Sequence, residues 1–281
     1  MKPQLDVVAL LLSVASVLPA QSRAADPVGN VVPLAIGETF TIASKILGEV
    51  RRINVYAPPG YAESPALSVP VLYMPDGGVA EDFLHVAGLV QVSVGNGTMR
   101  PFLLVGIENT ERRRDMTGPT TNDADRKIAT RVGGSQAFRA FIRTELMPAV
   151  KRRYRTTGET AIVGESLAGL FVVETLFLEP DLFDTYIAFD PSLWWNNQAL
   201  VGSADERLRS PQLMNKTLYF ASSAEQGIAD ATRRLAGVLE QYARRGLHWH
   251  YERMPEEQHS TIYHPAALRA FRALFKPTPS R

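Results

Sequence analysis

A serine with small neighbours lies near the middle of this 281-residue chain, in Gly164-Glu165-Ser166-Leu167-Ala168-Gly169. Small residues two positions before and two after a serine permit the tight strand-to-helix turn called a nucleophile elbow, which exposes the serine oxygen. Gly164 and Ala168 meet that need, although Ala168 departs from the usual glycine. Ser166 is therefore the predicted nucleophile. The alternative is an ordinary serine that caps a helix.

A serine hydroxyl needs a nearby base to remove its proton. Of the five histidines, His259 follows the last expected strand and a polar turn, and it precedes the last expected helix. This is where the base lies when serine, acid and histidine follow one another in that order. The others lie within expected strands or helices, or at the start of one: His85, His248, His250 and His264. We therefore predict His259 as the base, with a solvated loop histidine as the alternative.

The third member of such a triad is a carboxylate that orients the histidine and stabilises the imidazolium. We expect it after the strand at 217–221, where Glu225 is the first acidic residue. Asp190, directly after the strand at 185–189, is the alternative, and Asp230 comes third. Glu225 is the first choice, although a surface carboxylate near a helix start would look the same.

Acyl transfer also requires two N–H donors aimed at the developing oxyanion. The first is expected from Leu167, the residue after the nucleophile. The second is expected from the turn Pro75-Asp76-Gly77-Gly78, which follows an apolar strand. Gly77 is the predicted donor, and Gly78 could equally present an unshielded N–H. A plain glycine turn is the alternative.

Two further segments are candidates for substrate binding. Trp194 and Trp195 are adjacent and follow the strand that ends at Phe189, so they could stack on an aromatic group or a sugar. Equally, one tryptophan could belong to the core and the other could cover it. Arg112-Arg113-Arg114 lies in a long polar stretch and could pair with an anionic substrate. Arg114 could instead form a local pair with Asp115.

Strands and helices are expected to alternate along the chain. The expected strands span 39–43, 51–57, 69–74, 102–107, 160–163, 185–189, 217–221 and 247–253, and the expected helices span 81–92, 135–154, 167–178, 229–245 and 266–275. Unbroken apolar strands separated by helices predict an α/β fold with a mostly parallel central sheet and helices on both faces. Active sites of such sheets lie at the carboxyl ends of the strands.

Composition restricts the location and the partners of the protein. Residues 1–25 read as a signal peptide, with Lys2, an apolar run from Val7 to Leu18 and small residues near the end, which predicts a secreted or periplasmic protein. After cleavage no stable membrane insertion is expected, and 26–281 form one domain. The formal net charge of +1 gives no indication of nucleic-acid binding. Since cysteine is absent, disulfides and Cys-ligated metals are excluded.

Five segments together resemble the putative-esterase family of α/β hydrolases: MPDGG, VGIENTERRRDMT, GESLAGLF, DPSLWWNN and the late EEQH. That family includes siderophore esterases of the enterochelin type, S-formylglutathione hydrolases and feruloyl esterases. The resemblance runs from about Arg51 to the C-terminus and is greatest to the siderophore-esterase branch. It implies the α/β-hydrolase fold, Ser166 as nucleophile, His259 as base, and the turn at Asp76-Gly77 as part of the oxyanion hole.

The predicted activity is therefore hydrolysis of a small-molecule carboxylic ester through an acyl-enzyme on Ser166. No metal or other cofactor is expected. Two alternatives stay open at this point. One is an acyltransferase in which an alcohol replaces water, and the other is a non-catalytic ligand-binding protein that keeps the fold.

Overall fold

The computed structural model describes residues 31–243 and 246–277. The predicted signal peptide, 1–25, lies outside the described residues. Residues Ile36–Arg281 form one compact unit, and the description below concerns this unit alone. In the described part of the chain, no helix has both the length and the apolar character needed to cross a bilayer.

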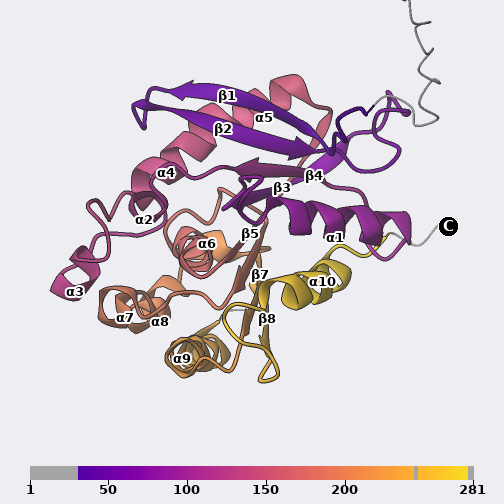
Figure 1. The fold of residues 1–281 in the computed structure, drawn as a ribbon. Helices are drawn as coiled ribbons and strands as arrows, with labels where there is room; N and C mark the ends of the chain where they lie inside the picture. Colours follow the sequence, from indigo (N-terminus) through magenta and orange to yellow (C-terminus); the bar gives the residue numbers. More distant parts are fainter. Residues whose placement is uncertain (1–30, 244–245, 278–281) are drawn as a thin grey trace, which may run out of the picture. The chain divides into compact units, whose positions relative to one another are not determined.

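An eight-stranded sheet with the order β1-β2-β4-β3-β5-β6-β7-β8 runs through this unit (Figure 1). Its strands are β1 Glu38–Ser44, β2 Glu49–Tyr56, β3 Val69–Pro75, β4 Leu103–Ile107, β5 Thr156–Glu165, β6 Thr185–Phe189, β7 Thr217–Ser222 and β8 His248–Arg253. β2 pairs antiparallel with both β1 and β4, and the pairings from β4 through β8 are parallel. The predicted α/β fold with a mostly parallel sheet is confirmed.

Helices cover both faces of the sheet. They are α1 Phe83–Gly95, α2 Arg112–Asp115, α3 Asp123–Arg126, α4 Ser135–Phe141, the π-helix η1 Ile142–Leu146, α5 Met147–Arg153, α6 Leu167–Leu178, α7 Trp195–Gly202, α8 Ala204–Arg207, the 3-10 helix η2 Pro211–Leu213, α9 Gln226–Tyr242 and α10 Tyr263–Leu274. α1 and α10 pack together on one face, whereas α4, α6 and α9 contribute to the core of the other face (Figure 1).

The central strands are buried on both faces because their side chains alternate between two apolar cores. In β3, Val71 and Tyr73 belong to the core under α4, α6 and α9, whereas Leu72 and Met74 belong to the core under α1 and α10. All residues of β3, β4 and β6 are buried. This explains why the strands appear in the sequence as unbroken apolar runs.

Two regions depart from the expected elements. The single helix expected over 135–154 contains a π-helical turn, η1, just before Pro148, a residue that has no N–H to donate to the preceding turn. After β6, in a segment for which the sequence predicts no helix, the chain forms α7 and α8, and the backbone of α7 is left-handed from Asn196 to Gln198. The hydrophobic pattern of that segment is too weak to predict a helix.

Candidate active site

A sharp turn between β5 and α6 presents Ser166. Its backbone has φ 60° and ψ −119°, a strained conformation for a residue other than glycine. A Cβ atom added to Gly164 would lie 2.7 Å from Cβ of Ala168, so only glycine fits there. The turn therefore tolerates alanine at position 168 because position 164 has no side chain.

The side chains of Ser166 and His259 are in direct contact. Nε2 of His259 lies 3.2 Å from Oγ of Ser166. His259 comes from the segment between β8 and α10, and 36 % of its side chain is exposed. This is a distance at which a proton passes between the two groups.

Asp190, the first residue after β6, contacts the other side of the imidazole. Its Oδ2 atom lies 3.0 Å from Nδ1 of His259, and the carboxylate is fully buried. Asp190 also accepts hydrogen bonds from the N–H of Ser223 at 2.7 Å and from its hydroxyl at 2.6 Å. These bonds fix the carboxylate where it can orient the imidazole.

Glu225, the first choice for the acid, forms no hydrogen bond or ion pair with His259 among the described residues. Glu225 is exposed at the start of α9, and its N–H donates to Oγ of Ser223. The segment after β7 therefore supplies Ser223, which holds the carboxylate in place, while the carboxylate itself follows β6. Asp190, the alternative acid from the sequence, makes the contact with His259 that we expect of the triad carboxylate.

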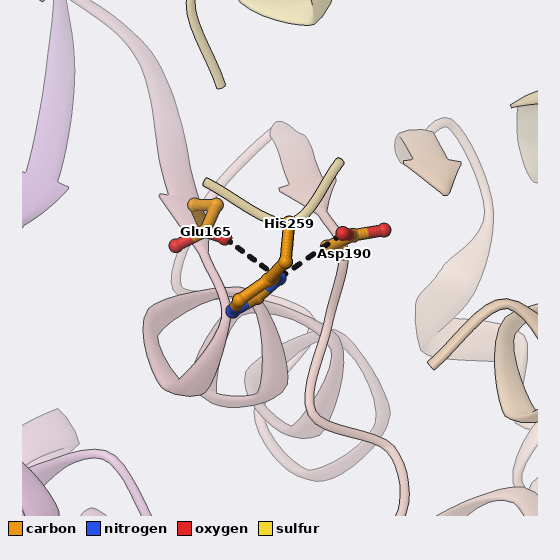
Figure 2. Close-up of side chains that lie close together, drawn as sticks. All are labelled: Glu165, Asp190 and His259. Carbon is orange, nitrogen blue, oxygen red and sulfur yellow. Dashed lines mark hydrogen bonds and ion pairs between the residues drawn. The ribbon is translucent and has the colours of Figure 1, made fainter. Parts of the chain in front are cut away.

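A second carboxyl group, which the sequence did not single out, lies beside His259 (Figure 2). Oε1 of Glu165 is 3.1 Å from Nδ1 of His259. The two atoms do not form a hydrogen bond, since the N–H is directed to Asp190, and Oε1 has no hydrogen-bond partner among the described residues. Glu165 directly precedes the nucleophile, and only that adjacency could have indicated it.

Two pKa values in this cluster depart from their ordinary values. The hydrogen bond that His259 donates to Asp190 raises the pKa of His259 above 6.5, partial burial opposes the shift, and Glu165 adds to it. Burial raises the pKa of Glu165 to about 8, although His259 and Arg112 act in the opposite direction. Both groups therefore hold protons more tightly than they would in water.

The expected oxyanion donors need a correction at Gly77. The N–H of Leu167 is the first of helix α6 and has no acceptor within that helix. The N–H of Gly77, however, donates to the carbonyl oxygen of Ile107 at 3.0 Å, and a Cβ on Gly77 would lie only 2.2 Å from the backbone of Ile107. Gly77 is thus a close-packing glycine whose amide is already used.

The neighbouring amide of Gly78 has a different kind of partner. It donates to Oε2 of Glu81 at 2.7 Å. Oε1 of the same carboxylate accepts a 3.3 Å hydrogen bond from the N–H of Asn109. A side chain can rotate away, whereas the backbone acceptor of Gly77 cannot.

The predicted binding residues Asp76 and Arg114 are engaged in ion pairs. Arg112 donates to both carboxylate oxygens of Asp76, at 2.6 and 2.8 Å, and Asn109 donates to it at 2.5 Å. Arg114 pairs with Glu49 at 2.7 Å and with Asp115 at 2.7 Å. Both side chains therefore stabilise the polar segment after β4, and neither presents a free charge to a ligand.

The two tryptophans divide between core and surface. Trp195 is 4 % exposed, and its indole N–H donates to the carbonyl oxygen of Gly118. Trp194 is 37 % exposed. It stands two residues after Ser192, whose Oγ lies 3.5 Å from Oγ of Ser166. Of the two, only Trp194 offers a surface to a ligand.

Ligand-type atoms of Glu165, Asp190 and His259 lie within 4.8 Å of one another, a spacing that metal ligands also have. In this arrangement, however, Nδ1 of His259 already has the buried carboxylate of Asp190 as its hydrogen-bond partner at 3.0 Å. A metal would have to replace that hydrogen bond. The geometry instead suits a serine, a histidine and an aspartate that act together in nucleophilic catalysis.

A family model described as "Putative esterase" matches residues 44–267 of the chain. Among characterised proteins, the chain is 27 % identical over 256 residues to ferri-bacillibactin esterase BesA of Bacillus subtilis, covering 82 % of this chain and 86 % of that protein. The resemblance inferred from the five sequence segments is thereby confirmed.

Solved structures give the same result. An IroE-like serine hydrolase from Shewanella oneidensis is 30 % identical, with a TM-score of 0.78 over 85 % of this chain and 80 % of that one. The siderophore hydrolase EstB from Aspergillus nidulans is 21 % identical, with a TM-score of 0.73 over 90 % of this chain and 99 % of that one, which shows a shared fold.

Proposed function

Because the chain belongs to the family described as "Putative esterase" and is a serine carboxylic-ester hydrolase, we propose that Ser166, His259 and Asp190 form its catalytic triad. The observation that carries the proposal is the unbroken line of contacts from Oγ of Ser166 through the imidazole to the buried carboxylate of Asp190. It replaces Glu225 by Asp190 as the acid and keeps the other two residues.

In the first step, Nε2 of His259 takes the hydroxyl proton while Oγ of Ser166 attacks the ester carbonyl carbon. The carbonyl π electrons move to the oxygen, which the N–H of Leu167 stabilises. When the C–O bond to the alcohol breaks, the alcohol takes the proton from Nε2. Water then attacks the acyl carbon and gives a proton to Nε2 of His259. The bond between that carbon and Oγ of Ser166 breaks, Oγ takes the proton from Nε2, and the free acid leaves.

We infer that Gly78 supplies the second oxyanion donor. Its N–H lies in the turn after β3, at the same edge of the parallel sheet as Ser166. Glu81 holds this amide in the free enzyme, and the side chain must rotate away when the oxyanion forms. Glu81 is only partly buried, which leaves room for that rotation.

We propose a siderophore-type ester as the substrate. Relatives named for the hydrolysis of ferri-bacillibactin and of siderophores support this class. A cavity of about 480 Å³ lined by 110–114 and 129–131 adds a physical argument, because Arg113 in its lining forms no ion pair among the described residues, whereas Arg112, Arg114 and Arg131 are paired with carboxylates. The guanidinium of Arg113 would attract an anionic metal-chelating ligand, and exposed Trp194 would stack on an aromatic ring of the same ligand. The lining of this cavity includes neither Ser166 nor His259.

We further propose that residues 1–25 direct export, so that the mature domain acts outside the cytoplasm. The supporting observation is the order of a basic residue, an apolar run of about 12 residues and small residues, which export signals share. The intact mass of protein recovered from the periplasm or the medium tests this. A mass that includes residues 1–25 would contradict it.

The substrate class is tested with a panel of iron-loaded and iron-free siderophore lactones, a feruloyl ester, an acetylated sugar and a p-nitrophenyl acyl ester. We expect kcat/KM to be highest for a siderophore lactone, with the free acid as product even when an acceptor alcohol is added. Preference for a feruloyl or acetyl-sugar ester would overturn the substrate class and leave the triad intact. Transfer of the acyl group to the acceptor would revive the acyltransferase alternative.

A further inference from the structure

Two carboxyl groups compete for a single N–H at the back of His259. Asp190 lies 3.0 Å from Nδ1 and accepts its hydrogen, whereas Oε1 of Glu165 lies 3.1 Å from the same atom and accepts no hydrogen bond from any described residue. A buried carboxyl oxygen without a partner is unfavourable, since the lost hydration is not replaced. Packing alone therefore does not explain why a carboxyl group lies at this position.

Orientation favours Asp190 in the intact site. The N–H and hydroxyl of Ser223 hold its carboxylate from behind. Among the described residues, no hydrogen bond holds the carboxyl group of Glu165 in this way, but its long side chain places Oε1 3.1 Å from Nδ1. Because the two atoms are already within hydrogen-bond distance, a rotation of the imidazole or of Glu165 is enough to align the hydrogen bond.

We propose that Glu165 is a second carboxyl partner of His259, a positioning residue that stabilises the imidazolium and takes over the Nδ1 hydrogen bond when Asp190 is removed. This inference rests on the proposed triad. It explains why the residue before the nucleophile is acidic. It also predicts that this enzyme tolerates the loss of its triad acid better than one with a single carboxylate.

Several charged or titratable groups act on Glu165 from the surrounding elements. Arg112 of α2 and His259 favour its carboxylate form, and Asp190 after β6 and Asp82 before α1 oppose it. From α10, the buried Tyr263 also interacts with Glu165. Glu165 and His259 therefore titrate as a coupled pair. When Glu165 is ionised, its charge stabilises the imidazolium.

The first test compares two replacements of Asp190. In D190A, the carboxylate of Glu165 can accept the Nδ1 hydrogen, so kcat should fall by only about 10²-fold. In D190N, the new amide donates to Nδ1 and fixes the wrong tautomer, so kcat should fall by about 10⁴-fold. The double variant D190A/E165Q should fall to the level of D190N. If it is no slower than D190A, the proposal is wrong.

E225Q in the D190A background is the matched control, because Glu225 is an exposed carboxylate that influences His259 only from a distance. This control should cause no further loss. Circular dichroism and thermal unfolding establish that each variant folds. S166A distinguishes failure of the triad from failure of the role proposed for Glu165, because activity retained in S166A would refute the triad itself, whatever Glu165 does.

A second readout does not depend on replacing Asp190. Glu165 has a pKa of about 8, so its charge, which raises the pKa of His259, develops as the pH rises toward and above that value. In E165Q the amide cannot ionise, so the part of the kcat/KM profile that follows the ionisation of Glu165 near pH 8 should be lost, and E165D should restore part of it. A residue that only fills space would leave the pH profile of E165Q the same as that of the wild type, and that result would also refute the proposal.

Discussion

Oγ of Ser166 lies 3.2 Å from Nε2 of His259, although 93 residues separate the two in the sequence. The two strands that precede these residues, β5 and β8, are not neighbours, because β6 and β7 lie between them. The loop after β8 must therefore reach back across the sheet. Hydrogen bonds from Met254 N–H to Ser222 O and from Ala224 N–H to Glu257 O hold it against the end of β7.

Replacing the nucleophile should abolish turnover without disturbing the fold. We expect S166A to reduce kcat by about 10⁴-fold or more, because no other group supplies the attacking oxygen. S192A is the matched control. Ser192 places its hydroxyl 3.5 Å from that of Ser166 but has no contact with His259 among the hydrogen bonds of the described residues. Steady-state hydrolysis of a p-nitrophenyl ester measures both, and an active S166A would contradict the assignment.

The close contact between Gly164 and Ala168 in the tight turn leads to a separate prediction about stability. A methyl group there would lie 2.7 Å from Ala168, so G164A should lower the free energy of unfolding by about 1–3 kcal/mol and displace Ser166. G158A, in the same strand β5, is the control, because a Cβ there meets no atom within 4 Å. The free energy of unfolding measured by chemical denaturation and the rate of ester hydrolysis should both fall in G164A, and neither should fall in G158A. Equal effects in the two variants would contradict this account.

The elbow and the positions of the strands along the chain can be predicted from the sequence because both depend on local patterns. Apolar strands between helices predict a parallel sheet, and small residues around Ser166 predict the turn. The sheet has the expected architecture, and β5 ends directly before Ser166.

Contacts between distant segments are harder to predict. The choice between Glu225 and Asp190 depends on Ser223, which holds Asp190 across 33 residues of sequence. Gly77 and Gly78 look alike in the sequence, yet one amide is bound by the backbone of Ile107 and the other by a side chain. The proximity of Glu165 to His259 depends on the path of the loop after β8, which no periodicity reveals.

The raised pKa values of Glu165 and His259 should make stability depend on pH. A group that binds its proton more tightly when folded stabilises the protein at low pH and loses this contribution as pH rises. For Glu165 the window runs from its ordinary pKa of 4.5 to about 8. His259, whose pKa is raised above 6.5, acts in the same direction.

We therefore expect the free energy of unfolding to fall more steeply between about pH 5 and pH 8 in the wild type than in E165Q. The neutral amide imitates the protonated acid at every pH in this window. Urea unfolding at several pH values measures the difference, and E225Q should follow the wild type. Parallel curves for wild type and E165Q would show that burial does not perturb Glu165.

Replacing each of the two adjacent tryptophans should affect a different property, stability in one case and substrate binding in the other. Trp195 is 4 % exposed and donates to Gly118, so W195A should lower the free energy of unfolding by about 3–5 kcal/mol. Trp194, at 37 % exposed, contributes less to the core, and W194A should leave the melting temperature nearly unchanged.

If Trp194 stacks on an aromatic group of the substrate, W194A should raise KM by about tenfold for an aromatic siderophore lactone, which corresponds to a stacking energy near 1.4 kcal/mol. KM for a small aliphatic ester is the control and should not change. A uniform loss for both substrates would mean that Trp194 supports the site rather than the ligand.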